Sequence, residues 1–403
     1  MASTDYDIIT VGGGLGGASL AKVMAEHGSR VLVIERETKF KDRVRGEAMP
    51  PWSVADARRI GILETIMAAG GHELPKMMIY VGQMQIGERD LVATTPENTP
   101  MLAFFHPQVQ EALLAAATEA GAEVQRGARV TLVTPGETPN VVVEHKGEKA
   151  TITARMVVAA NGRGSPARSW GGFEVKHDED HLLIAGQLFD EMPAEEDANR
   201  FVFNFDLGHG ALLFPQGGGR VRAYTVMQSA AGIRFQGEKE LPRFIEDAVG
   251  SGMPAELFKN AKPEGPLATF DGADAWVDHP YKEGVALIGD AAASSDPSWG
   301  QGLALTTRDV RVLTEELKAT DDWDAAGHAY AMEHDRHFGV VHQLSNWMSE
   351  LFLTFGPEAD ARRANAMPLI AQDGDRIPDV LSSGPDMEVG EAERRRMFGE
   401  DGD

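Results

Sequence analysis

The sequence predicts an α/β protein in which a mostly antiparallel β domain is inserted into a domain built on a parallel sheet. Three observations support this fold class. Residues 6–34 have the pattern of a β-α-β unit with a glycine-rich first turn, residues 182–227 are dominated by long β-type segments, and residues 285–319 read as a strand, a turn and a helix. The chain therefore leaves a first domain and later returns to it.

The first domain begins with a short apolar strand over residues 6–11, which a glycine cluster separates from a helical apolar pattern over residues 15–27. Gly28 ends this helix, and residues 31–34 form the next strand. Residues 107–120 predict a strong helix, because Pro stands at its first turn and Gly follows its end. Further strands are expected at residues 130–133, 141–144 and 151–159.

The inserted domain is expected mainly between residues 177 and 270, where Gly217-Gly218-Gly219 predicts a hairpin turn. A helix over residues 323–352 follows the returning segment, and the polar, acidic residues beyond about 372 are expected to be poorly ordered. The expected division is a discontinuous first domain (1–75, 100–176 and 277–330), the inserted substrate domain (76–99 and 177–276), a C-terminal helical region (331–371) and an acidic tail (372–403).

Composition excludes several classes of function. The 403 residues include 62 Asp and Glu against 38 Lys and Arg, a formal charge of -24, so no nucleic acid partner is expected. The absence of cysteine excludes disulfides and thiolate metal sites and favours a cytoplasmic location, and no metal site is expected. No segment approaches the roughly 20 apolar residues of a membrane span, and no signal peptide is indicated.

A glycine motif at the first turn predicts a dinucleotide site. Gly12-Gly13-Gly14-Leu15-Gly16-Gly17 matches G-x-G-x-x-G, and Glu35 ends the second strand. Gly12 permits the tight turn, Gly14 lets backbone approach a pyrophosphate, and Gly17 allows close helix packing. The helix N-terminus favours phosphates, and Glu35 would accept hydrogen bonds from ribose hydroxyls. The alternative is a glycine-rich turn that holds no ligand.

A second turn lies far along the chain. Residues 285–288 form a buried strand that delivers Asp290 to its end, and residues 296–302 (DPSWGQG) lead into a helix. Together the two turns resemble the FAD signatures of the p-hydroxybenzoate-hydroxylase-like (aromatic hydroxylase) family of FAD-dependent monooxygenases, which implies a glutathione-reductase-like Rossmann FAD domain. The resemblance implies that Asp290 binds a ribityl hydroxyl and that the helix N-terminus faces the N1 and C2 carbonyl edge of the flavin. The alternative is an ordinary strand-to-helix turn.

A third segment, residues 157–168, resembles the family's D-G-x-x-S-x-x-R stretch near the FAD pyrophosphate, which is also implicated in NAD(P)H use. Asn161 stands where the family has Asp, so a hydrogen bond is kept but a charge is lost. NAD(P)H and reduced flavin from a separate reductase are both open as electron sources. Ala293 and Ala304 replace the family's usual His and Asn, so backbone must make the contacts near the pyrimidine ring.

Two further positions resemble family contacts. The stretch Arg43-Val44-Arg45-Gly46-Glu47 matches the family's Arg-Gly-Glu segment, in which an Arg pairs with phosphate or ribityl oxygens; a solvated basic loop is the alternative. His106 falls where the family has Arg or Gln at the ribityl chain. The expected FAD contacts are Gly12, Gly14, Leu15, Gly16, Gly17, Glu35, Arg36, Arg45, His106, Val130, Asn161, Asp290, Pro297, Gly300, Gly302 and Leu303.

The resemblance implies a monooxygenase that inserts one oxygen atom from O2 into an aromatic or polyketide-like small molecule through a C4a-hydroperoxyflavin. The protein must then supply a dry cavity between its domains, because water promotes decay of the peroxide. A stripe of apolar residues in the β domain either walls that cavity or forms sheet core: Phe201, Phe203, Phe205, Leu212 and Phe214.

No motif marks a catalytic residue. His209, His181 and Tyr224 are candidate bases by location alone, and a surface or core role is open for each. Three residues flank the loops near the flavin and are candidates for substrate contact: Met49, Trp52 and Trp299.

Other activities share this fold. A flavin reductase of carbon-carbon double bonds, similar to geranylgeranyl reductases, is one alternative, although those enzymes usually carry a cysteine near the flavin. A halogenase is disfavoured because the W-x-W-x-I-P segment is absent. A scaffold with structural FAD, acting as a non-redox cyclase or binding module, is a third alternative. The expected partners are a small-molecule substrate, O2 and, in one alternative, a flavin reductase; substrate identity and oligomeric state are not indicated.

Overall fold

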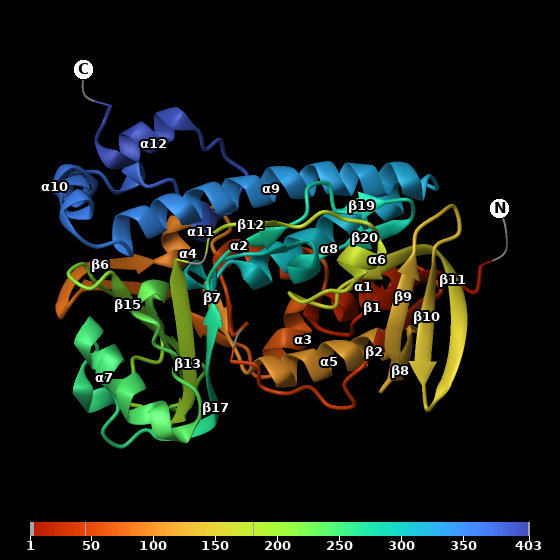
Figure 1. The fold of residues 1–403 in the computed structure, drawn as a ribbon, viewed down its shortest axis with the longest axis horizontal. Helices are drawn as coiled ribbons and strands as arrows, with labels where there is room; N and C mark the ends of the chain where they lie inside the picture. Colours follow the sequence, from red (N-terminus) through yellow and green to blue (C-terminus); the bar gives the residue numbers. More distant parts are fainter. Residues whose placement is uncertain (1–3, 45, 180, 402–403) are drawn as a thin grey trace.

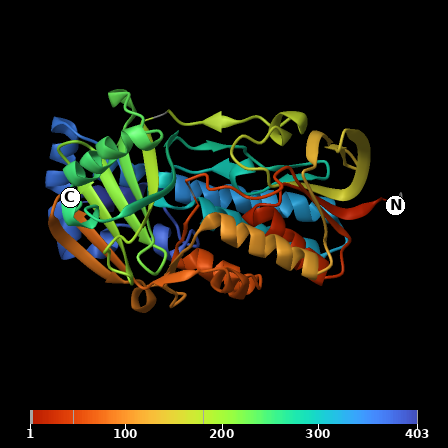
Figure 2. The same cartoon turned by 90° about the horizontal axis from the view of Figure 1, so that it is seen from below.

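The computed structural model describes residues 4–44, 46–179 and 181–401. Two large β-sheets form the centres of two adjoining bodies, and one long helix, α9 (Trp323–Phe352), runs along both of them (Figure 1). Figure 2 shows the two bodies side by side, with the mostly antiparallel sheet at one end and helices α1 (Leu15–Glu26) and α5 (His106–Glu119) at the other. The α/β class with an inserted, mostly antiparallel sheet is therefore confirmed.

The first body is built on an eight-stranded sheet with the order β19-β20-β11-β1-β2-β8, and β10 and β9 continue it from β11. The five strands β20, β11, β1, β2 and β8 are parallel. The strands are β1 (Tyr6–Val11), β2 (Val31–Glu35), β8 (Glu123–Arg126), β9 (Arg129–Thr134), β10 (Asn140–His145), β11 (Glu148–Ala159), β19 (Tyr281–Lys282) and β20 (Val285–Leu287).

The parallel strands are buried on both faces, which explains their continuous apolar sequences. Ile8 packs on the face covered by α1, α5 and α8 (Gly302–Ala319), whereas its neighbour Ile9 packs on the opposite face with residues of β9 and β10. This packing fixes the carboxyl end of β1 and the start of α1 relative to each other.

The second body is built on a seven-stranded sheet with the order β17-β13-β16-β15-β14-β5-β6. All neighbours are antiparallel except β14 and β5. Helix α7 (Leu241–Ser251) covers one face, and the other face turns toward the first body. The strands are β5 (Lys76–Val81), β6 (Met84–Asp90), β13 (Leu182–Asp190), β14 (Ala198–Asn204), β15 (His209–Pro215), β16 (Val221–Gln228) and β17 (Lys262–Asp271).

The remaining helices and strands are mostly short. They are β3 (Ala48–Met49), α2 (Pro51–Arg59), α3 (Leu63–Ala68), β4 (His72–Leu74), α4 (Leu91–Thr94), β7 (Met101–Ala103), α6 (Ala167–Trp170), β12 (Lys176–His177), β18 (Ala275–Trp276), β21 (Ala293–Ser294), α10 (Pro357–Gln372), α11 (Val380–Ser383) and α12 (Glu391–Phe398). Short 3-10 turns are η1 (Ser229–Ala231), η2 (Glu238–Glu240), η3 (Ala255–Leu257), η4 (Gly289–Ala291), η5 (Pro297–Trp299) and η6 (Gly374–Arg376).

The C-terminal residues differ from expectation. The prediction that residues beyond 372 are poorly ordered is wrong for the described part, because α12 folds back and buries Met397 and Phe398 almost completely. Asn365 of α10 donates its side-chain N–H to the Phe398 carbonyl at 2.7 Å. The expected boundary between residues 330 and 331 also falls inside the continuous helix α9. Within the described part of the chain, no helix combines the length and apolar character that crossing a membrane requires.

Candidate functional site

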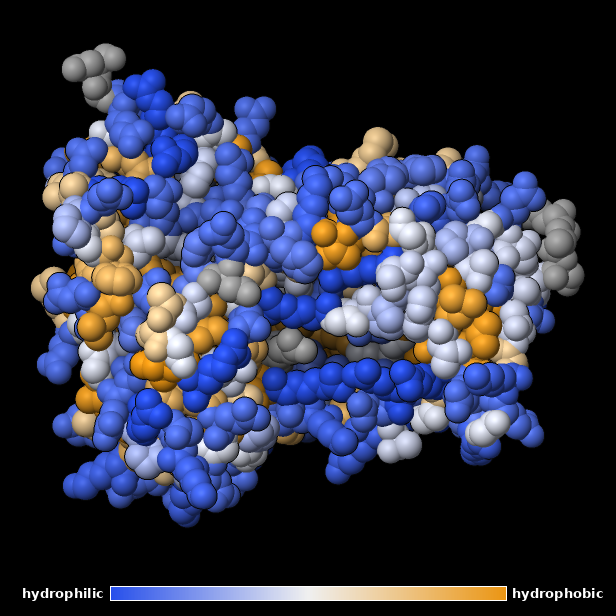
Figure 3. All heavy atoms as spheres, viewed as in Figure 1, coloured by the Kyte–Doolittle hydropathy of each residue, from blue (hydrophilic) through white to orange (hydrophobic). Residues whose placement is uncertain are grey.

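A cavity of about 570 Å³ lies between the two bodies. Its lining joins the turn after β1, the segment from β20 to α8, and the face of the seven-stranded sheet that turns toward the first body. In the view of Figure 1, the surface is hollowed between the two bodies, with hydrophilic side chains along the hollow (Figure 3). Its volume is within the range of small-molecule and cofactor sites.

The turn after β1 is shaped for close approach of a ligand. Gly12 has φ +104°, and a Cβ there would lie 2.6 Å from the Ala160 carbonyl oxygen. A Cβ on Gly17 would collide with the Gly12 carbonyl, whereas Gly14 faces open space apart from the Gln110 amide. No side chain caps α1 at Gly14, and its first turn holds no acidic residue, so its first N–H groups are left for an anion.

Glu35 is held beside this turn. Its Oε2 accepts a hydrogen bond from the Gly13 N–H at 2.7 Å, and its Oε1 accepts one from the Glu37 N–H at 2.7 Å. The side chain is buried at the cavity edge, so it stays in place without a ligand. Each carboxylate oxygen keeps a second lone pair, which a ribose hydroxyl can use. The residues present therefore fit the adenosine end of FAD.

The second turn lies across the cavity. Asp290 lies in η4, and Arg168 supports this turn by donating hydrogen bonds to the carbonyls of Asp290 at 2.6 Å and Ala291 at 2.8 Å. Gly300 then adopts φ +68°, which lets the chain turn into α8. Helix α8 has no side-chain cap and no acidic residue in its first turn, so its N-terminus offers positive potential to the cavity.

A buried polar cluster borders the cavity through Glu47 and Tyr224. The Tyr224 hydroxyl donates a short hydrogen bond to Glu47, and Arg222 lies 3.3 Å from Glu47 and 2.8 Å from Asp42. Burial raises the pKa of Glu47, against the opposing effect of Arg222, and burial beside Glu47 raises the pKa of Tyr224 well above its usual value. Gly186 makes room for the Tyr224 ring, since a Cβ there would lie 2.5 Å from it.

The sheet supplies an apolar wall beside Tyr224, made of Ile184, Leu212, Phe214 and Phe270. Of the predicted apolar stripe, Leu212 and Phe214 on β15 line the cavity. Phe201, Phe203 and Phe205 do not: Phe203, for example, packs against Trp299 and Phe352. On the neighbouring strand β14, Phe205 also packs against Phe352 of α9 and Phe201 packs against Phe214, which an alternating pattern alone does not reveal.

The structure brings most of the predicted FAD contacts to this cavity. Gly17 lies outside the lining and acts through packing, and Arg45 lies outside the described residues. The predicted contacts that line the cavity are Gly12, Gly14, Leu15, Gly16, Glu35, Arg36, His106, Val130, Asn161, Asp290, Pro297, Gly300, Gly302 and Leu303.

Sequence reasoning missed other lining residues. Gln110 lies one helical turn after His106, a spacing that could have indicated it. Arg163 donates hydrogen bonds to the carbonyls of Asp271 at 2.9 Å and Ala273 at 2.6 Å, so it bridges the two bodies, and no local pattern marks it. Further missed residues are Arg129, Ser294, Ser295 and Thr306.

Two of the three candidate bases that the sequence suggests do not line the cavity. His209 does not line the cavity: its Nδ1 lies 3.3 Å from Asp247 of α7 on the other face of the sheet. His181 is exposed beside Glu179. Tyr224 alone of the three candidates lines the cavity.

The tryptophans and Met49 are also not in the lining. Trp52 donates its indole N–H to Gln301 at 3.2 Å, and Trp299 donates to Ser349 at 2.8 Å. Met49 is fully buried. These residues support the cavity from behind, so the expectation that they contact substrate directly is wrong for this structure.

The fold and the cavity define a dinucleotide-binding α/β oxidoreductase. The family model described as FAD binding domain matches residues 5–333, so the chain belongs to this family. The match confirms FAD as the cofactor and confirms the resemblance to FAD-dependent aromatic hydroxylases.

Individual relatives have different activities. A digeranylgeranylglycerophospholipid reductase of Methanocaldococcus jannaschii is 23% identical over 368 residues, which cover 85% of this chain and 88% of the relative. Aklavinone 12-hydroxylase DnrF of Streptomyces peucetius subsp. caesius is 31% identical over 338 residues, which cover 75% of this chain and 65% of the hydroxylase. The structure of p-nitrophenol 4-monooxygenase PnpA from Pseudomonas putida DLL-E4 matches with a TM-score of 0.78 at 18% identity, covering 96% of this chain and 100% of PnpA.

Proposed function

We propose that this protein is a monooxygenase that inserts one oxygen atom from O2 into an aromatic or polyketide-like small molecule. The observation that carries the proposal is the cavity in which both predicted FAD-binding turns meet an apolar, aromatic wall of the seven-stranded sheet. The similarity to an aklavinone hydroxylase and to the fold of a p-nitrophenol monooxygenase supports the same class of substrate.

Reduced FAD supplies the electrons that activate O2, and the balanced reaction is R–H + O2 + NAD(P)H + H⁺ → R–OH + H2O + NAD(P)⁺. The chain must bind the cofactor, orient the substrate and exclude water. The two glycine-bearing turns bind the cofactor. In this proposal Glu35 accepts hydrogen bonds from the ribose, the N-terminus of α1 holds the diphosphate, and Asp290 binds the ribityl chain.

The N-terminus of α8 would face the pyrimidine edge of the flavin. Gly300 and Gly302 expose backbone there, and the positive end of an 18-residue helix stabilises negative charge on that edge. Because Ala293 and Ala304 carry no polar side chain, backbone N–H groups take this task.

The substrate would lie against Leu212, Phe214 and Phe270, which exclude water from the reacting atoms. Tyr224 is the polar group on this wall. We propose that its hydroxyl oxygen, whose O–H is donated to Glu47, accepts a hydrogen bond from a hydroxyl of the substrate and orients it toward the flavin. Burial raises the pKa of Glu47, and Arg222 at 3.3 Å acts in the opposite direction, so the carboxyl stays in place as the acceptor of the Tyr224 hydroxyl.

Product labelling tests the proposal. The purified protein with FAD is given NAD(P)H, or separately supplied reduced flavin, with phenols and polycyclic aromatic ketones under ¹⁸O2. We expect substrate-stimulated O2 consumption and one ¹⁸O atom in the product. Unlabelled products, or no product with either electron source, would count against oxygenation. The comparison of the two electron sources also decides whether Asn161 permits direct use of NAD(P)H.

A second candidate is a reductase of carbon-carbon double bonds, which the similarity to the digeranylgeranylglycerophospholipid reductase favours. Such an enzyme adds two hydrogen atoms to its substrate and does not need O2. Reaction of an isoprenoid substrate at the same rate without O2, with a product two hydrogens heavier, would establish this candidate in place of the monooxygenase.

A further inference from the structure

Among the residues that the structure describes, two groups of His and Asp side chains are close enough together to hold a metal ion, and both lie outside the cavity lining: Asp309, His334 and His337, and Asp178, Asp274 and His342. In each group, three candidate ligand atoms lie within 4.8 Å of one another. The two groups differ in how far hydrogen bonds already account for them, and that difference decides which of them is suited to hold a metal ion.

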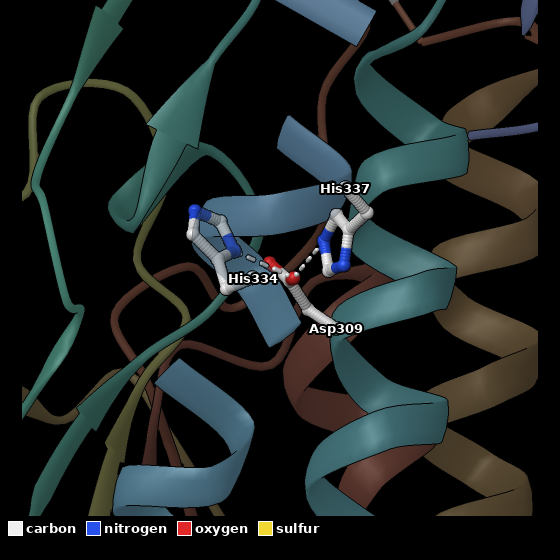
Figure 4. A group of neighbouring side chains, drawn as sticks. All are labelled: Asp309, His334 and His337. Atoms are coloured by element: carbon white, nitrogen blue, oxygen red, sulfur yellow. Dashed lines mark hydrogen bonds and ion pairs between the residues drawn. The ribbon is translucent and has the colours of Figure 1, made fainter. Parts of the chain in front are cut away.

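Hydrogen bonds account for the first group. Asp309 of α8 accepts through one carboxylate oxygen from His334 Nδ1 at 2.8 Å and His337 Nε2 at 3.0 Å, both on α9 (Figure 4). Its other oxygen accepts from the Gly289 N–H at 2.7 Å. A metal ion would move the imidazole protons to the opposite ring nitrogens, which are buried and have no hydrogen-bond partner. Because buried unpaired N–H groups are costly, this group is a brace and not a metal site.

The second group keeps an unpaired acceptor. Asp274 is 3% exposed, and its Oδ1 accepts a short hydrogen bond from the Asp296 N–H. Its Oδ2 is buried without a hydrogen-bond partner, 3.7 Å from His342 Nε2. The same imidazole nitrogen lies 2.6 Å from Asp178 Oδ2 and 3.1 Å from the Asn346 amide nitrogen, a contact that a metal ion at this position would replace. One N–H group cannot satisfy two carboxylates, so Asp274 Oδ2 points at His342 with nothing to accept.

The charged groups next to Asp274 and His342 are carboxylates and one arginine. Asp296 adds a third carboxylate, whose Oδ1 accepts hydrogen bonds from the backbone N–H and the hydroxyl of Ser298. The nearby Arg163 donates its N–H groups to the carbonyls of Asp271 and Ala273, not to these carboxylates. Closely spaced carboxylates in a protein interior need a proton or a cation for compensation.

We propose that Asp178, Asp274 and His342 bind one divalent transition-metal ion, and that Zn²⁺ suits this mixed carboxylate and imidazole set best. The His342 side chain is 20% exposed, so the proton that metal binding leaves on Nδ1 can be hydrated, unlike those of the first group. Phe338 stacks on the His342 ring at 5.4 Å between centroids, and Trp276 contacts it at 4.9 Å, which holds the imidazole in position.

Such an ion would join three segments behind the cavity. Asp178 follows β12, Asp274 precedes β18, and His342 belongs to α9. Strand β18 pairs with β21, and the Asp296 N–H binds Asp274, so the ion would also stiffen the segment that carries Ser294, Ser295 and Pro297 into the cavity. The site is structural, and its metal takes no part in the chemistry proposed above.

Calorimetric titration of the chelator-treated, full-length protein with Zn²⁺ tests the proposal. We expect one Zn²⁺ per chain, a higher melting temperature with Zn²⁺, and at least 100-fold weaker binding in D274N and in H342Q. Should H342Q fail to fold, D178N replaces it, because Asp178 is partly exposed and its loss leaves the core intact. The binding measurement does not depend on the catalytic activity.

The control is His328→Gln. His328 is exposed and His279 is half-buried, and their ring nitrogens lie 2.7 Å apart, so adventitious Zn²⁺ would compete for this pair. H328Q is expected to keep stoichiometric binding. The proposal is overturned if wild-type protein takes up no stoichiometric Zn²⁺, or if H328Q abolishes binding while D274N retains it.

Discussion

At the scale of single residues, the cavity depends on where side chains are missing as much as on where they are present. Gly12 and Gly28 both have positive φ, +104° and +94°, but a Cβ at Gly12 meets the Ala160 carbonyl, whereas one at Gly28 meets nothing within 4 Å. Substitution of each glycine by alanine therefore distinguishes the effect of backbone strain, which both positions share, from the effect of a collision in the turn after β1, which only Gly12 would suffer.

Gly12→Ala is expected to weaken FAD binding by about 100-fold, because the turn must shift away from the position that admits a pyrophosphate. Gly28→Ala carries the same kind of backbone strain, roughly 1–2 kcal/mol, and is expected to bind FAD normally. Quenching of FAD fluorescence during titration measures both affinities. Equal losses in the two variants would show that only strain matters.

Tyr224→Phe is expected to lower turnover by about tenfold and leave FAD affinity unchanged, because one hydrogen bond of about 1–1.5 kcal/mol to the substrate is removed. His209→Gln, on the far face of the sheet, is the matched control and is expected to keep full turnover. Steady-state kinetics with the best substrate measure the turnover of both variants. A lowered turnover in H209Q with unchanged turnover in Y224F would show that His209, and not Tyr224, acts on the substrate.

At the scale of elements, α9 supports the second FAD turn through residues that it packs against the first body. Tyr330 donates a hydrogen bond to the Leu287 carbonyl at 2.5 Å, and His334 and His337 reach Gly289 through Asp309. Near its end, Ser349 accepts from Trp299. A single rigid helix thus holds the segment between β20 and α8 at several points.

The Asp309 brace makes stability depend on acid pH. Burial alone would raise the pKa of Asp309, but the two histidines lower it from 3.8 to about 2. A lowered pKa contributes stability that is present above pH 3.8 and lost as the pH falls through 2, roughly 2 kcal/mol. Asp309→Asn is expected to unfold more easily in urea at pH 7 and to show a smaller loss between pH 4 and pH 2. An unchanged acid profile would contradict the brace.

Strong local signals were predictable from the sequence. Glycine turns, the Trp323–Phe352 helix and the fold class follow from local patterns, because special backbone angles and helical periodicity leave a mark in the sequence. Contacts between residues of different elements leave no such mark in the sequence. His209 and Tyr224 lie on neighbouring strands, but only the pairing of β15 with β16 shows that they face opposite sides of the sheet.

The C-terminal helix shows the same limit, because its polar composition hides two buried residues. Phe398→Ala is expected to lower the free energy of unfolding by about 3–5 kcal/mol, as for other buried aromatic residues. Glu388→Ala, at an exposed position nearby, is expected to change it by less than about 0.5 kcal/mol. Denaturant melts give both free energies of unfolding. Equal, small effects of the two substitutions would show that α12 does not pack against the rest of the protein, as its polar composition suggests.

At the scale of the whole molecule, the site exists because two bodies meet. The first body carries both glycine-bearing turns, the second carries the apolar wall, and Arg163 and α9 hold them together. A cavity of this kind cannot be seen in any one segment of sequence, which is why the cofactor end of the site was predictable and the substrate end was not.

The most direct test is a crystal structure of the protein with FAD. The account predicts the adenosine ribose beside Glu35, the diphosphate at the N-terminus of α1, and the isoalloxazine between Pro297 and the wall that Leu212 and Phe214 form. Flavin density at any other place, or a cavity without flavin in protein that carries FAD, would contradict it.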